Sequence, residues 1–155
     1  MRGWGVGALP VDILDLQTAL EVTAEMSGIA TKAAIGCLKC EDINPSEVEI
    51  SIVFVDDVYI AELNREYRGI QNPTDVLSFP MDDPCMPGDE PRPLGDIVIS
   101  LETVERDASC FGGFRNYLAL LVVHGLLHLL GYDHETDEDA KVMEERETQV
   151  LAGLL

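Results

Sequence analysis

Apolar positions recur with two different spacings along this chain, and these spacings predict its strands and helices. Alternating apolar residues lead into a continuous apolar run at Val48–Val55, which predicts a strand that enters a core. Residues 76–79 and 97–101 are short apolar runs bounded by turn residues, so we expect two further short strands there.

Four longer segments show the spacing of amphipathic helices. They comprise residues 15–38, 57–67, 115–130 and 137–151. Side chains that can cap a helix N-terminus precede the second and the fourth: Asp56 or Asp57, and Thr136 or Asp137. Gly69 and Gly131 stand where the second and third should end. On the last helix we expect an inward face made of Val142, Met143, Val150 and Leu151.

Strands and helices alternate irregularly, which predicts a single small α+β domain over residues 1–155. We expect a short mixed β-sheet packed with helices. Residues 1–12 begin with a glycine-rich stretch and are expected to be loose. Residues 81–93 hold four prolines and are expected to be a loop.

Composition excludes some classes of protein. No apolar run reaches the roughly 18–20 residues that span a bilayer, and the N-terminus lacks the order of a signal peptide, so we expect a cytoplasmic protein without a membrane partner. The net charge of −19, from 29 acids against 10 bases, argues against non-specific binding to nucleic acid, and we expect no DNA partner. Any RNA-binding surface must be local, and we expect a neutral or basic patch there, with Arg68 facing it and Arg65 or Arg92 as further candidates.

Four cysteines are present, and in a cytoplasmic chain they are expected to be free thiols. Cys37 and Cys40 form a single C-x-x-C without a second pair nearby, so we interpret them as half-buried thiols near a helix end.

All three histidines of the chain lie within eleven residues, in HGLLHLLGYDH. His124 and His128 are four residues apart on the predicted helix, so their imidazoles project from one face. Gly131 permits a reversal that returns His134 to the same point. Three imidazoles with an open fourth position are typical of a catalytic zinc site, so we predict one Zn²⁺ per chain at the long helix and the turn after it.

The same spacing occurs in zinc peptidases of the metzincin type, which carry glutamate as a general base directly after the first histidine. Here that position is Gly125, which cannot accept a proton. The spacing therefore favours metal-dependent hydrolysis and disfavours peptide hydrolysis. Phosphodiester cleavage can depend more on the metal and on cations that stabilise the phosphate.

Four stretches of this sequence resemble the YbeY family of bacterial endoribonucleases, also called rRNA maturation factors. They are Leu63-Asn64-x-x-Tyr67-Arg68, Pro73-Thr74-Asp75-Val76-Leu77-Ser78-Phe79-Pro80, Leu94-Gly95-Asp96-Ile97, and the segment from His124 to His134. The resemblance covers roughly residues 48–151, and its last stretch is highly specific.

The resemblance implies a single-strand-specific, metal-dependent endoribonuclease that acts in 16S ribosomal RNA 3′-end maturation and ribosome quality control. The family's metal ligands match His124, His128 and His134, and its functional arginine matches Arg68, which we predict to be a catalytic residue that stabilises phosphate. The implied partners are single-stranded RNA and components of the small ribosomal subunit. Many members carry an acidic residue about seven positions before the first histidine, where this chain has Tyr117.

Other residues and other functions remain open at this stage. Thr74, Asp75 and Asp96 are interpreted as turn residues first, and Asp133 as a residue that orients His134 or relays a proton. The alternatives to a ribonuclease are a zinc peptidase-like hydrolase and a non-catalytic ribosome-assembly factor with a structural zinc. Structural zinc would need a fourth protein ligand, for which Cys37, Cys85 or Cys110 is available.

Overall fold

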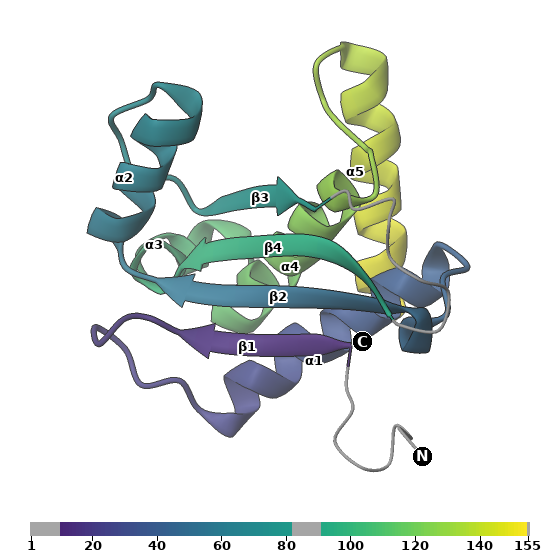
Figure 1. The fold of residues 1–155 in the computed structure, drawn as a ribbon, viewed down its shortest axis with the longest axis horizontal. Coiled ribbons are helices and arrows are strands. Elements are labelled where there is room, and N and C mark those ends of the chain that lie inside the picture. Colours follow the sequence, from purple (N-terminus) through teal and green to yellow (C-terminus); the bar gives the residue numbers. More distant parts are fainter. Residues whose placement is uncertain (1–9, 82–90, 155) are drawn as a thin grey trace.

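The strands form one mixed sheet, with helices on both of its faces (Figure 1). A computed structural model describes residues 10–81 and 91–154. The strands are β1 (Val11–Asp15), β2 (Val48–Val55), β3 (Val76–Pro80) and β4 (Arg92–Ser100), in the spatial order β1-β2-β4-β3. β1, β2 and β4 are parallel, and β3 is antiparallel to β4. The predicted α+β architecture with a mixed sheet is confirmed.

Within residues 10–81 and 91–154, five α-helices pack around the sheet. They are α1 (Ala24–Cys40), α2 (Asp57–Arg68), α3 (Leu101–Asp107), α4 (Phe114–Leu129) and α5 (Asp137–Ala152), with short 3₁₀ helices at Pro45–Glu47 and Ala108–Phe111. In Figure 1, α1, α3 and α4 lie behind the sheet, while α2 and α5 rise at opposite ends of β3. Among the described residues, no single helix has the length and apolar character of a membrane span. The segments Leu101–Phe111 and Phe114–Leu129 reach that length and character only when taken together, and they are bent by 111° relative to each other.

The buried apolar residues in the described part of the chain form two clusters, one on each face of the sheet. The larger joins α1, α4 and α5 to side chains such as Ile52, Phe54 and Ile97. The smaller lies on the other face, where Ile60 of α2 packs with Val53 and neighbouring strand residues. Because successive strand residues point to opposite faces, the continuous apolar run of β2 serves both clusters.

Local chemistry sets the ends of the helices that carry the site. The Asp56 side chain accepts a hydrogen bond from the Tyr59 backbone N–H and begins α2, and Gly69 ends it with φ 72°. Thr136 caps α5 by accepting from Asp139 N–H. After α4, Gly131 has φ 103°, a conformation that favours glycine.

Several predicted boundaries were wrong. The segment expected to be helical from residue 15 begins with the last residue of β1 and continues without regular structure over residues 16–23. The helix begins only at Ala24, where Thr23 caps it. Val11 and Asp12, expected to be loose, belong to β1, because pairing with β2 orders them; residues 1–9 lie outside the described chain.

The strand expected at residues 97–101 begins earlier and ends earlier. It starts at Arg92, because β2 pairs with it from there to Ser100, while β3 pairs only with its part from Gly95 to Ile99. It ends at Ser100, whose side chain caps the unpredicted α3. The expected loop at 81–93 therefore loses its last residues to β4, and residues 82–90 lie outside the described chain. On α5, Val142 is exposed and not part of the inward face.

Candidate metal centre

The three histidines lie together at the end of α4 and in the turn that follows it. His124 Nε2 and His128 Nε2 are 3.1 Å apart, and one nitrogen of each of the three imidazoles lies within 4.8 Å of the others. His124 and His128 are half-buried, whereas His134 is exposed. The spacing argument that placed the three rings at one point is therefore matched by the geometry.

The turn that carries His134 is tied to the rest of the molecule. The Tyr132 backbone N–H donates to the Leu127 carbonyl at 3.0 Å, across the position of Gly131. The Tyr132 hydroxyl accepts a hydrogen bond from Arg146 Nε of α5 at 3.3 Å. Asp133 accepts from the Glu135 backbone N–H, so its carboxylate shapes the turn. These contacts tie the turn that carries His134 to the end of α4 and to α5.

The donor set fits a tetrahedral zinc ion. With Zn–N bonds of about 2.0–2.1 Å, two imidazole nitrogens on one tetrahedral ion lie about 3.3 Å apart. The 3.1 Å between His124 and His128 is close to that value, and one nitrogen of His134 lies within 4.8 Å of both. Among the described residues, no further His, Cys, Asp or Glu joins the group, which leaves a coordination position for water or substrate.

Glu147 of α5 is a site residue that sequence reasoning missed. Its Oε2 lies 2.9 Å from His124 Nδ1, and its side chain is only 13% exposed. A carboxylate on the second ring nitrogen fixes the tautomer and orientation of a ligating histidine. The sequence held a signal for it, because Glu147 lies four residues after Met143 and three before Val150, on the buried stripe of α5.

The surroundings of His128 favour the neutral form of its imidazole. Burial, followed by the proximity of His124 and His134, lowers the pKa of His128 below its ordinary value of 6.5. The ring is therefore neutral at neutral pH, which is the form that ligates metal.

A cavity of about 630 Å³ opens over the three histidines. Tyr67 and Arg68 at the end of α2 line it, together with residues of β3 and the turn from Gly131 to Glu135. The structure thus brings Arg68 to the same cavity as the histidines. Arg65 and Arg92 do not line the cavity, so Arg68 is its arginine, and the acids Asp133 and Glu135 line it as well.

Close packing against the sheet explains why residue 125 is glycine, and it also limits the chemistry at this position. A Cβ at this position would lie 2.6 Å from Ile97 Cγ2 and 3.1 Å from Ser78 Oγ, so the residue faces the sheet. Its carbonyl accepts a hydrogen bond from that same serine hydroxyl at 2.9 Å. A general base of the peptidase type has no room at this position.

Asp75 and Tyr117, two further positions singled out in the sequence, make structural contacts with each other. Asp75 accepts hydrogen bonds from the Val76 backbone N–H and, at 2.8 Å, from the Tyr117 hydroxyl, so it anchors β3 on α4. Tyr117 is buried and does not line the cavity; burial, then the bond to Asp75, raises its pKa. Tyr117, seven positions before the first histidine, therefore supports the sheet in this protein. The carboxylate beside the histidines comes from Glu147.

The cysteines in the described chain do not supply a fourth ligand. Cys37 lies in the core, where burial first, then Glu41 and Cys40, raises its pKa to about 12. Cys40 is half-buried near the end of α1 and Cys110 is exposed, and none of the three lines the cavity. Cys85 lies outside the described residues.

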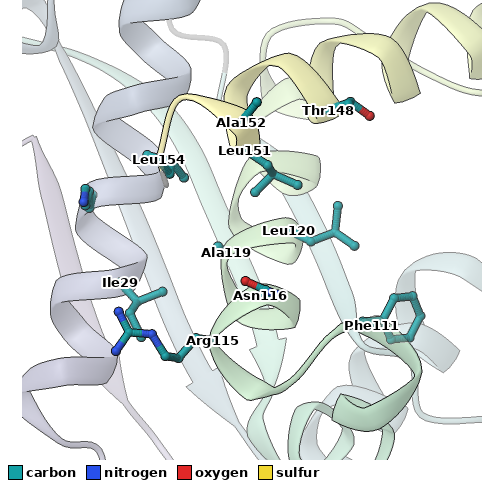
Figure 2. Close-up of a pocket in the computed structure, with 11 residues that line it drawn as sticks. Ile29, Phe111, Arg115, Asn116, Ala119, Leu120, Thr148, Leu151, Ala152 and Leu154 are labelled. Atoms are coloured by element: carbon teal, nitrogen blue, oxygen red, sulfur yellow. The ribbon is translucent and has the colours of Figure 1, made fainter.

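A second cavity, of about 500 Å³, lies between α1, α4 and α5 (Figure 2). Ile29, Leu120 and Leu151 contribute apolar side chains to its walls. None of its lining residues is a histidine, cysteine, aspartate or glutamate, so it offers no metal ligand.

Known proteins resemble this chain both in sequence and in structure. Residues 12–155 match the family described as Endoribonuclease YbeY. The chain is 47% identical over 149 residues to a protein of that name from Pelotomaculum thermopropionicum, covering 94% of this chain and 97% of the relative. It is 46% identical over 154 residues to the one from Agrobacterium fabrum, covering 91% of each.

Among solved structures, the solution structure of TM1509 from Thermotoga maritima is similar, with a TM-score of 0.62 and 29% identity. The match covers 93% of this chain and 88% of that protein. The four sequence stretches, the histidine cluster and these matches agree, and the chain belongs to the YbeY family of endoribonucleases.

Proposed function

We propose that this protein is a single-strand-specific, zinc-dependent endoribonuclease, and that the single domain carries the whole activity. The observation that carries the proposal is the open cluster of three imidazoles in one cavity with Arg68. Relatives of this chain at up to 47% identity over nearly their full length are named endoribonucleases, which supports RNA as the substrate.

Each residue has a separate task in this proposal. His124, His128 and His134 would hold the metal, and Glu147 would keep the His124 ring in place through Nδ1. A zinc ion held there would supply an activated water and polarise a phosphate oxygen. The Arg68 guanidinium would bind the phosphate with its planar fork and stabilise the charge that develops on it. Gly125 leaves the peptidase base position empty, which favours a phosphodiester over a peptide as substrate.

We further propose that the RNA is ribosomal, that the cleavage matures the 3′ end of 16S ribosomal RNA, and that the protein works in the cytoplasm and in ribosome quality control. The net charge of −19 supports a docking partner among the basic proteins of the small subunit in addition to RNA. Co-sedimentation with small subunits tests this, and binding should weaken as salt is raised.

The direct test is cleavage by the purified protein of one RNA sequence, offered single-stranded and as a duplex. We expect cleavage of the single strand only, loss of cleavage with a chelator, and recovery when zinc is returned. His128→Ala should be inactive, whereas Arg115→Ala, an exposed cation on the same helix outside the histidine cavity, should cleave like the parent. Equal cleavage by the His128→Ala protein would exclude this site as the nuclease.

A further inference from the structure

Tyr67 lies on the apolar stripe of α2 but is exposed to solvent. It continues the stripe of Ile60 and Leu63, which belong to the smaller apolar cluster on one face of the sheet. Ile60 is fully buried, but Tyr67, two helical turns later, is 62% exposed. An exposed aromatic ring beside the candidate metal centre is a surface on which a flat ligand can stack.

The Tyr67 ring packs against another aromatic ring although it is exposed. It lies 5.0 Å from the Phe79 ring, centroid to centroid, at an interplanar angle of 68°. An edge-to-face pair of this kind is a favoured aromatic arrangement, and it leaves ring surface uncovered. The contact with Phe79 restricts the orientations open to the ring, which lowers the side-chain entropy lost when a flat ligand binds.

The position of the ring relates it to the proposed phosphate site. Tyr67 and Phe79 line the same cavity as the three histidines, and Arg68 is the next residue along α2. Pro80 and Leu77 extend an apolar wall along β3. A phosphate bound between Arg68 and the histidines therefore brings the nucleosides attached to it close to an aromatic surface.

We propose that Tyr67 is a specificity-determining residue that stacks on one unpaired base next to the phosphate held by Arg68. This inference rests on the proposed function. A nucleobase can reach the ring only when it is unstacked and turned out, which an unpaired strand permits and a duplex opposes. The preference for single strands would then arise at this wall of the cavity.

The test compares binding of short single-stranded RNAs that each carry one abasic nucleotide, moved stepwise along the strand. Binding is measured by fluorescence anisotropy with the protein stripped of metal, so that cleavage does not interfere. For the parent, one position should show a loss of affinity of about 5- to 150-fold, because stacking on an aromatic side chain contributes about 1–3 kcal/mol per base. In Tyr67→Ala the intact RNA should bind as weakly as the parent binds that abasic RNA, and the position-specific loss should vanish.

Two variants control for folding and for general exposure. Tyr67→Phe keeps the ring and should behave like the parent, which a role for the hydroxyl would not allow. Tyr59→Ala removes another exposed tyrosine of α2, 42% exposed and outside the cavity, and should also behave like the parent.

The outcomes separate this inference from the proposed function. If the parent cleaves single-stranded RNA and the abasic loss persists in Tyr67→Ala, the stacking role is wrong and the nuclease stands. If the parent neither binds nor cleaves single-stranded RNA, both are wrong.

Discussion

The carboxylate of Glu147 directs the His124 ring, because its Oε2 lies 2.9 Å from Nδ1 and leaves Nε2 to face His128. Glu147→Gln keeps the size of the side chain and removes its charge. We expect zinc affinity to fall about 10- to 100-fold, the range for partners that orient a ligand. Competition with a chromogenic chelator measures this. Glu145→Gln, exposed on the same helix, is the matched control and should bind zinc like the parent.

Arg68 lines the cavity from the last turn of α2 and is exposed, so it contributes little to stability, on the order of 0–1 kcal/mol. A charge placed at a reacting phosphate contributes more, about 3–4 kcal/mol. Arg68→Ala should therefore keep zinc content and thermal stability but cleave RNA roughly 100-fold or more slowly in single-turnover assays. Arg68→Lys should recover part of the rate, because the charge remains and the fork is lost.

Arg65→Ala serves as the control for the Arg68 variants, since Arg65 is an exposed arginine of the same helix that does not line the cavity. It should cleave like the parent. A loss of zinc or of folding in Arg68→Ala would make Arg68 a structural residue instead.

Among elements, α4 and the sheet meet at a contact that only glycine permits. Gly125→Ala would place a Cβ 2.6 Å from Ile97 Cγ2, so either the helix or the strand must shift. We expect a loss of about 1–3 kcal/mol in the free energy of unfolding, measured by urea denaturation. Gly28→Ala is the matched control within α1, where a Cβ meets nothing within 4 Å. There we expect a gain of about 0.5–1 kcal/mol; equal effects of the two substitutions would contradict the packing argument.

The elements that sequence reasoning found are those whose signals are local. α4 has a long apolar pattern and a glycine after it, and α2 and α5 carry their own capping side chains. β1 was missed because its five residues become a strand only by pairing with β2, whose pairing residues begin at Ile50, far along the chain. α3 was missed because it is only seven residues long and directly follows β4.

The same distinction applies to the site. The spacing of the three histidines predicted their cluster, because two are one helical turn apart and the third follows a glycine. The pairing of Glu147 with His124 depends on how α5 packs against α4, which no short-range pattern encodes. Its position on the buried stripe of α5 indicated only that a carboxylate needed a partner.

For the whole molecule, acidity and metal binding act together. In the metal-free protein, the folded state holds the pKa of His128 below its ordinary value of 6.5, so the unfolded chain binds the proton more readily. Stability therefore falls as pH drops through about 6.5 toward the lower folded value. The same proton competes with zinc, because only the neutral imidazole ligates. Acid should thus remove the stabilisation that zinc supplies.

We therefore predict that the rise in thermal midpoint on adding zinc is large at about pH 7.5 and shrinks steadily toward about pH 5. At zinc concentrations 100 times Kd the expected stabilisation is about 2.7 kcal/mol. The difference between paired melts, with zinc and with chelator, is the quantity to measure. Protonation of the many acids that give the net charge of −19 affects both melts alike and cancels in this difference. His128→Ala should show little zinc effect at any pH. A stabilisation by zinc that stays constant across this range, or that persists in the variant, would mean that zinc binds to the surface acids and not to the three histidines.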